Sequence, residues 1–132
     1  MARFPAESQE QKKRIADIRR GEIYLCSCDP TVGHEIKKTR PALVLQNDIG
    51  NRFSPLTIVA AITSSISVAS YPVEVVVDPS SANGLGVRSA IRLNQIRTVD
   101  RKRLIRRLGA VDAGAMAKVD QALKISLGLI RI

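Results

Sequence analysis

The chain alternates short runs of β-forming residues with turn-forming residues over most of its length, and this pattern constrains its fold more than any other feature. The runs cover 22–28, 42–46, 56–63, 73–77, one or two strands within 89–99, and 106–111. Turn residues such as Pro30, Pro72 and Gly84 lie between them. Short, closely spaced strands without intervening helices predict a mainly β domain, built as a small twisted barrel.

The last part of the chain has the period of a helix instead. Apolar residues recur there at three- and four-residue spacing: Met116, Val119, Leu123 and Leu127. Asp112 stands where a helix N-cap is expected, so the sequence predicts a helix over Ala113–Leu127 that packs its apolar stripe on the sheet. Of the connecting segments, 47–55 is expected to be a polar loop and 100–107 a single helical turn.

Length and N-terminal composition predict the domain organisation. A chain of 132 residues can bury one hydrophobic core, which means one domain. Residues 1–19 are rich in charge and poor in apolar anchors, so we expect a helical or disordered extension, followed by a domain over 20–132. The extension lacks the apolar region of a secretory signal, and no apolar run reaches the ~20 residues that span a bilayer. A cytoplasmic location is therefore expected.

Positive charge is concentrated in two segments of a chain whose formal net charge is +9. Residues 1–20 hold six bases and three acids, and residues 97–107 hold six bases and one acid. Clustered positive charge favours a polyanionic partner, because it releases counterions condensed on a phosphate backbone; a merely solvated surface is the alternative. Aromatic residues make up only 3% of the chain, so we expect nucleic acid to be held by charge and hydrogen bonds rather than by serial stacking.

The motifs of most enzyme classes are missing from the sequence. His34 is the only histidine, and Cys26 and Cys28 are one residue apart, so these side chains do not supply the ligands of a metal site. A glycine-rich phosphate loop and a nucleophile elbow are also missing, and no cofactor is expected. An enzyme of this kind needs a substrate that carries its own nucleophile, as RNA does in its 2′-hydroxyl. The protein then supplies proton transfer and hydrogen bonds to the phosphoryl oxygens.

Arg40 and Thr63 have the chemistry for that task. Pro41 biases Arg40 towards extended backbone, and a guanidinium matches a phosphate with two parallel hydrogen bonds. Thr63 ends an apolar run and carries a hydroxyl on a stiff, β-branched side chain. If the strands that begin at Arg40 and end at Thr63 are neighbours, the two groups can converge on one phosphate. The alternative is a solvated arginine and a threonine that caps a turn.

Several motifs resemble those of the MazF/PemK (Kid) family of toxin endoribonucleases. The likeness covers about Arg20 to Leu129 and rests on RRGEIYLCSCDPTVGHEIKKTRPALVLQND, followed by VAAIT, NQIRTVDRKRL and VDQALKISLGL. It implies a mainly β fold, an SH3-like β-barrel of the CcdB/Kid/MazF type with a C-terminal α-helix. It also implies a homodimeric toxin that cuts single-stranded RNA, including mRNA, sequence-specifically and without a metal. The expected products are a 2′,3′-cyclic phosphate and a 5′-hydroxyl, and the expected effect is inhibition of translation and growth.

The resemblance also implies roles for single residues. In the MazF branch, the arginine and threonine matched by Arg40 and Thr63 are catalytic, in proton transfer and in positioning the phosphate. In the Kid branch, a histidine and an arginine matched by His34 and Arg92 are implicated, with an aspartate that is Asn94 here. Asn94 has no basic group. We therefore assign catalysis to Arg40 and Thr63, and treat His34 and Arg92 as auxiliary catalytic or phosphate-binding residues.

A further set of polar residues is expected to bind the RNA: Glu35, Lys37, Lys38, Asn94, Gln95 and Arg97. The two amides can hydrogen-bond base edges and so help to set the cleavage sequence. The family resemblance implies an acidic MazE-like antitoxin, whose carboxylates would compete with RNA for the same positive charges. Contact with DNA is expected only through the antitoxin complex, and no membrane partner is expected.

Two other functions remain open at this point. A basic SH3-like barrel can bind nucleic acid without cutting it, and Asn94 keeps that possibility open. A CcdB-like topoisomerase poison is expected to share the fold, although it has no evident need for the pairing of Arg40 with Thr63. Incubation with RNA in EDTA separates cutting from binding, because binding alone leaves the strands intact.

Overall fold

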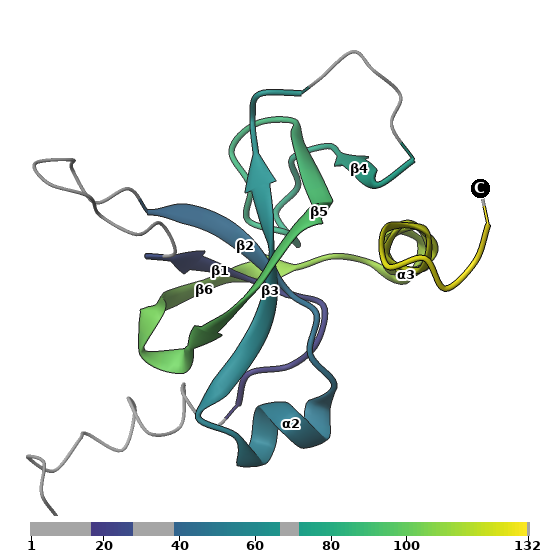
Figure 1. The fold of residues 1–132 in the computed structure, drawn as a ribbon. Coiled ribbons are helices and arrows are strands. Elements are labelled where there is room, and N and C mark those ends of the chain that lie inside the picture. Colours follow the sequence, from purple (N-terminus) through teal and green to yellow (C-terminus); the bar gives the residue numbers. More distant parts are fainter. Residues whose placement is uncertain (1–16, 28–38, 67–71, 132) are drawn as a thin grey trace, which may run out of the picture.

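The protein is described by a computed structural model that covers residues 17–27, 39–66 and 72–131 (Figure 1). The expectation for the N-terminal extension therefore falls mostly outside the described residues. The elements are β1 (Glu22–Cys26), β2 (Arg40–Val44), α2 (Asp48–Phe53), β3 (Leu56–Thr63), β4 (Glu74–Val77), β5 (Ser89–Asp100), the 3₁₀ turn η1 (Arg101–Arg103), β6 (Leu104–Ala110) and α3 (Ala113–Ser126).

The strands form one six-stranded, strongly twisted antiparallel sheet in the order β4-β5-β3-β2-β1-β6 (Figure 1). The predicted class, mainly β with a C-terminal helix, is confirmed. In the part of the chain that the structure describes, β4 and β6 are the two edges of the sheet and do not pair. The sheet is thus a barrel that is not closed.

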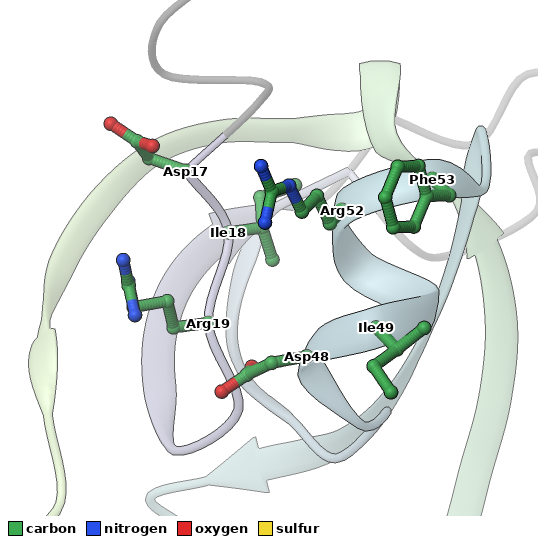
Figure 2. A pocket seen from close by; sticks show the side chains of 7 residues that line it. All are labelled: Asp17, Ile18, Arg19, Asp48, Ile49, Arg52 and Phe53. Atoms are coloured by element: carbon green, nitrogen blue, oxygen red, sulfur yellow. The ribbon is translucent and has the colours of Figure 1, made fainter.

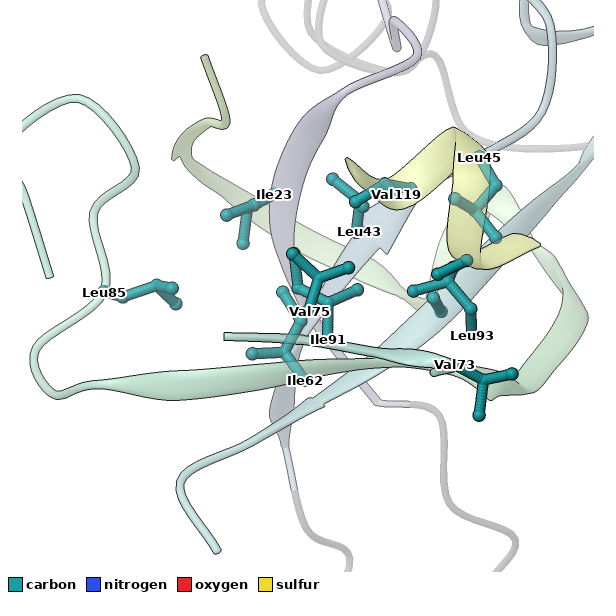
Figure 3. Close-up of a cluster of buried hydrophobic side chains, with 12 residues drawn as sticks. Ile23, Leu43, Leu45, Ile62, Val73, Val75, Leu85, Ile91, Leu93 and Val119 are labelled. Carbon is teal, nitrogen blue, oxygen red and sulfur yellow. The ribbon is translucent and has the colours of Figure 1, made fainter. Parts of the chain in front are cut away.

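Alternation along the strands builds a hydrophobic core on each face of the sheet. The main core lies under α3, and its residues include Ile23, Leu43, Ala60, Ile62, Ile91, Leu93, Val119 and Ala122 (Figure 3). The second core lies on the other face and consists of Ile18, Tyr24, Cys26, Ala42, Val44, Val59 and Val99, with Leu104 packed against them. Sequence neighbours such as Leu43 and Val44 enter opposite cores because strand side chains alternate between faces.

The opening motif RRGEIY is a structural clamp at the start of β1. Arg20 donates from Nε to the carbonyl of Leu45 at 2.7 Å and from Nη2 to Asp120 of α3 at 2.5 Å. Gly21 adopts a positive φ of 93°, which a residue with a side chain rarely tolerates. Glu22 accepts from Arg107 Nε at 2.6 Å. These contacts tie β1 to β2, β6 and α3, so the motif serves the fold.

Residues 47–55, expected to be a polar loop, contain the short helix α2. Asn47 is its N-cap and accepts from the backbone N–H of Gly50 at 2.8 Å. Asn51 is completely buried and accepts from the Thr57 hydroxyl at 2.7 Å. The Asn51 amide also donates to the carbonyl of Gln46 at 2.8 Å. The loop prediction was wrong because hydrogen bonds of a buried amide, rather than an apolar stripe, anchor this helix.

The C-terminal helix begins as predicted, with Asp112 accepting from the N–H of Ala115 at 2.7 Å. It ends at Ser126, and the predicted stripe is only partly buried, because Val119 is enclosed while Leu127 is exposed. The expected helical turn over 100–107 is shorter, a 3₁₀ turn that passes directly into β6. Within the described residues, no helix is long and apolar enough to cross a membrane.

Candidate functional site

β2 and β3 are neighbours in the sheet, which is the condition for Arg40 and Thr63 to act together. Their antiparallel register pairs Ala42 with Ala61 and Val44 with Val59. The pairing ends at Ala42 and Ala61, and Arg40 and Thr63 lie beyond it at the same end of the two strands. Both residues lie two positions beyond the Ala42–Ala61 pair, so their side chains are on the face of that pair.

A cavity of about 220 Å³ lies beside this pair, and we call it the Arg40 pocket. Its lining is Arg40, Pro41, Ala42, Val59, Ala61, Gln95, Ile96 and Arg97. Two short side chains face each other across the strands at Ala42 and Ala61, and this leaves the space open. The pocket thus has an aliphatic floor and carries two guanidinium groups and an amide, a combination suited to a base and its flanking phosphates.

An irregularity in β5 brings Gln95 to the pocket. Ala60 pairs with Ile96, but the next residue, Ala61, pairs with Arg92, so residues 93–95 have no partner on β3. Within this bulge Leu93 turns into the main core, whereas Asn94 and Gln95 are exposed. Gln95 joins the lining of the Arg40 pocket, and Asn94 does not. A bulge of this kind re-aims side chains next to functional sites.

The Thr63 hydroxyl accepts one hydrogen bond from a neighbouring residue and can still donate another. Its oxygen accepts from the backbone N–H of Ser65 at 3.1 Å, which is the turn contact that the alternative interpretation expects. A hydroxyl that accepts one hydrogen bond still donates its own proton, so Thr63 can also bond to a phosphoryl oxygen. Arg92 lies beside this turn and donates from Nη2 to the Ser65 carbonyl at 3.1 Å.

The basic residues of 97–107 differ in burial and in their hydrogen-bond and ion-pair partners. Arg97 lines the Arg40 pocket. Arg101 is buried and donates to the carbonyl of Ser54 at 3.0 Å, and burial lowers its pKa from the ordinary value. Arg107 is paired with Glu22, and Arg103 donates to the carbonyl of Ser27 at 3.0 Å. The charge available to a polyanion is therefore smaller than the sequence count suggests.

Four of the predicted site residues lie outside the described residues: His34, Glu35, Lys37 and Lys38. Their segment leaves the end of β1 and returns at the start of β2, where Cys26 pairs with Arg40. In the described part of the chain, no group of three or more His, Cys, Asp or Glu side chains is placed to hold a metal ion.

A larger cavity, of about 740 Å³, lies between α2 and the segment before β1 (Figure 2). Its charged lining is balanced: Asp17 and Asp48 against Arg19 and Arg52. The apolar part is contributed by Ile18, Ile49 and Phe53, of which Ile49 is 75% and Phe53 76% exposed. A balanced site lacks the positive potential that attracts a polyanion, so the Arg40 pocket is the better candidate.

Sequence reasoning named the polar residues of the Arg40 pocket but not its floor. The sequence predicts only strand positions for Ala42, Val59, Ala61 and Ile96, and for Pro41 only an effect on the backbone of Arg40. The available signal was the pair of small residues in PALV and VAAIT, which marks a hollow only once the two alanines are known to face each other.

The sequence is similar to that of known proteins over most of its length. Residues 19–127 match the family model of the PemK-like, MazF-like toxin of type II toxin–antitoxin systems. The chain is 49% identical over 113 residues to endoribonuclease EndoA of Bacillus subtilis (strain 168), covering 86% of this chain and 97% of that protein. It is 46% identical over 112 residues to endoribonuclease MazF of Staphylococcus epidermidis, covering 85% and 92%.

The fold is similar to a solved structure of the same family. The MazE–MazF crystal structure (Form-II) from Deinococcus radiodurans superposes with a TM-score of 0.69 and 28% identity, covering 86% of this chain and 97% of that chain. The family model and the two curated relatives each span most of the sequence. The chain therefore belongs to the PemK/MazF family of toxins of type II toxin–antitoxin systems.

Proposed function

We propose that the protein is a toxin endoribonuclease that cuts single-stranded RNA, including mRNA, at a specific sequence without a metal ion. The observation that carries the proposal is the pairing of β2 with β3, which brings the strand ends that bear Arg40 and Thr63 to the same end of the sheet, beside a pocket lined by Arg40, Gln95 and Arg97. Relatives that are 46% and 49% identical are named endoribonucleases, which supports the same activity here. Cleavage of mRNA would inhibit translation and growth.

The reaction is an attack of the RNA 2′-oxygen on the adjacent phosphorus. The 2′-O–P bond forms and the P–O5′ bond breaks, which leaves a 2′,3′-cyclic phosphate and a 5′-hydroxyl. One proton leaves the 2′-hydroxyl and one is delivered to the departing O5′. Arg40 is assigned to proton transfer and to neutralising the charge of the phosphorane, and the Thr63 hydroxyl donates to a non-bridging oxygen. His34 is assigned as an auxiliary base or a phosphate contact, since an imidazole can accept a proton or donate a hydrogen bond.

RNA is held on both sides of this reaction centre. Gln95 offers an amide to the edge of a base that rests on the aliphatic floor of the pocket, and Arg97 binds a neighbouring phosphate. Asn94, exposed on the same bulge, contacts the next base. Glu35, Lys37 and Lys38 complete the RNA-binding set from the segment between β1 and β2.

The proposed protein partners are an acidic MazE-like antitoxin and a second copy of the chain. An antitoxin rich in carboxylates can cover Arg40 and Arg97, and the similar MazF of Deinococcus radiodurans has been solved with MazE. For the homodimer, exposed apolar residues at the end of α3 and after it provide a surface: Leu127, Leu129 and Ile130. The toxin is expected to act in the cytoplasm, where mRNA is its substrate.

Incubation of the purified protein with a long single-stranded RNA in EDTA tests this function. We expect cleavage at a recurring sequence, found by sequencing the new 5′ ends, with the same rate after magnesium is added. RNA that is bound but remains intact would instead identify a nucleic-acid-binding module. Cleavage that requires magnesium would contradict the proposed mechanism.

A further inference from the structure

We propose that Glu74 and Arg92 are positioning residues that hold the Thr63 hydroxyl in its working orientation. Both act on RNA only through Thr63, in place of the auxiliary catalytic or phosphate-binding role that the family resemblance implies for Arg92. This inference rests on the proposed function, because it gives the Thr63 hydroxyl a task in cleavage. It concerns three strands, since Glu74 lies on β4, Arg92 on β5 and Thr63 at the end of β3.

Ser65 is the link between Thr63 and Arg92. Its N–H donates to Thr63 Oγ1 at 3.1 Å, and its carbonyl accepts from Arg92 Nη2 at 3.1 Å. Both backbone polar groups of Ser65 are therefore fixed, one by each residue. Because the Ser65 N–H occupies a lone pair of the threonine oxygen, it limits the directions in which the hydroxyl hydrogen can point.

Arg92 is in turn held by Glu74. The two residues are cross-strand partners in the β4–β5 register, and Arg92 also pairs with Ala61 of β3. Arg92 Nε lies 3.4 Å from Glu74 Oε1, and the side chains are 25% and 14% exposed. Arg92 Nε is buried without a hydrogen-bond partner, so this carboxylate compensates its charge. An ion pair that is mostly enclosed is screened less than a surface pair.

The rate of cleavage is expected to depend on the direction in which the Thr63 O–H bond points. A donor aimed at a phosphoryl oxygen stabilises the transition state only if it is already in place, and losing one such donor costs about a hundredfold or more in rate. If Glu74 is neutralised, Arg92 is free to leave the Ser65 carbonyl, and the turn that orients Thr63 loosens. The hydroxyl then remains present but is less often aligned, so the expected loss is smaller than that of removing Thr63.

The test combines Glu74→Gln and Arg92→Ala with Thr63→Ala, using RNA cleavage under single-turnover and steady-state conditions. We expect E74Q and R92A to lower kcat about tenfold and to leave KM within about twofold, because ground-state RNA binding does not depend on the hydroxyl direction. In the T63A background, neither change lowers kcat further, since the group through which they act is gone. Glu74→Asp, which keeps the charge on a shorter side chain, should recover part of the loss.

The chain offers a matched control in the Arg88–Asp78 pair. It also joins residues near the ends of β4 and β5, at 3.3 Å, but its side chains are 67% and 84% exposed. Asp78→Asn should leave kcat and KM unchanged. Melting temperatures of all variants are measured so that a loss of folded protein is not mistaken for a loss of rate.

Three outcomes decide the proposal. Equal loss from E74Q or R92A in the wild-type and T63A backgrounds would overturn it, because it would mean that these residues act on the RNA independently of Thr63. A rise in KM with kcat unchanged would also overturn it and would make Arg92 a ground-state phosphate ligand. If wild-type protein cuts no RNA at all, the proposed function fails, and that result is visible before any variant is compared.

Discussion

The division of labour between Arg40, Thr63 and His34 is a question about single side chains. Arg40 begins β2 and Thr63 ends β3, so the two residues lie at the same end of these neighbouring strands. A guanidinium supplies parallel hydrogen bonds and a permanent charge, which suit the phosphorane, whereas an imidazole suits proton removal. The rates of alanine variants separate these contributions.

We expect Arg40→Ala and Thr63→Ala each to lower kcat by about a hundredfold or more, because each removes a group that interacts with the transition state. His34→Ala should lower it less. Single-turnover cleavage rates measure the order, and circular dichroism confirms that each variant is folded. A larger loss from His34→Ala than from Arg40→Ala would transfer the role of principal base to His34.

Tyr24 provides a prediction that concerns the fold alone. Its phenol is buried in the second core and donates to Glu22 Oε1 at 3.2 Å, and burial, followed by the charge of Glu22, raises its pKa to about 12. Since the folded-state pKa lies above the ordinary ~10, the contribution of Tyr24 to stability is complete below pH ~10 and is lost as the pH rises towards 12.

The tyrosinate absorbance during an alkaline titration measures this directly. We expect one component that titrates well above the ordinary range and that disappears in Tyr24→Phe. Stability of the wild type should fall between pH ~10 and 12 more steeply than that of Tyr24→Phe. If the component that disappears in Tyr24→Phe titrates near pH ~10, the phenol is not enclosed as described.

At the scale of elements, periodicity predicted the strands well and the connections less well. The segment LTIVAAIT was assigned as a strand with the bounds that β3 has, since its apolar run ends at turn residues on both sides. The helix α2 was missed, because Asn51 looks polar in the sequence and is buried only through its bonds to Gln46 and Thr57. The bulge at 93–95 was not predicted either, because register belongs to a pair of strands and not to one sequence.

The Arg40 pocket exists because two alanines face each other across β2 and β3, so enlarging one should close it. We expect Ala61→Leu to raise KM for RNA by about tenfold or more while the protein still folds. Overpacking typically costs ~1–3 kcal/mol, which most folded domains survive. The matched control is Ala117→Leu, the same change at an exposed position of α3. Unchanged RNA binding by Ala61→Leu would show that the base is held elsewhere.

For the whole molecule, charge decides how partners approach. The formal net charge is +9, but the basic residues do not all attract a partner equally. Arg101 is buried, and Arg107 is paired with Glu22. The exposed part includes Arg40 and Arg97 at the pocket. Sequence counting found the basic surplus, but burial and pairing in three dimensions determine which charges a partner can meet.

We expect the association rate of an acidic antitoxin to fall as salt concentration rises, because exposed charges steer the encounter. Stopped-flow mixing at low and high ionic strength measures the rate, and competition with an uncleavable RNA shows whether the two ligands share the site. Arg97→Ala should reduce the salt dependence. Simultaneous binding of peptide and RNA, with a rate that salt leaves unchanged, would mean that the antitoxin inhibits from a distance.

The sequence suggests which residues have the chemistry for the candidate site, but it does not give the shape of the pocket. Arg40 and Thr63 have suitable chemistry, but the resemblance to the MazF branch is what favours them over solvated or turn-capping residues. Their juxtaposition depended on which strands pair, and the role proposed for Glu74 depended on a cross-strand contact with Arg92. Neither the pairing of strands nor the Glu74–Arg92 contact can be read from a local sequence pattern, because each joins residues that are distant in the chain.

In the proposed reaction the RNA supplies the nucleophile, and the protein supplies Arg40 and Thr63 around its phosphate. The most direct measurement compares two otherwise identical RNA substrates in EDTA, one of which lacks the 2′-hydroxyl at the scissile position, with analysis of the product ends. We predict that the unmodified RNA yields a 2′,3′-cyclic phosphate and a 5′-hydroxyl, and that the 2′-deoxy substrate is bound but not cut. Cleavage of the 2′-deoxy substrate, or products ending in a 5′-phosphate, would contradict the account.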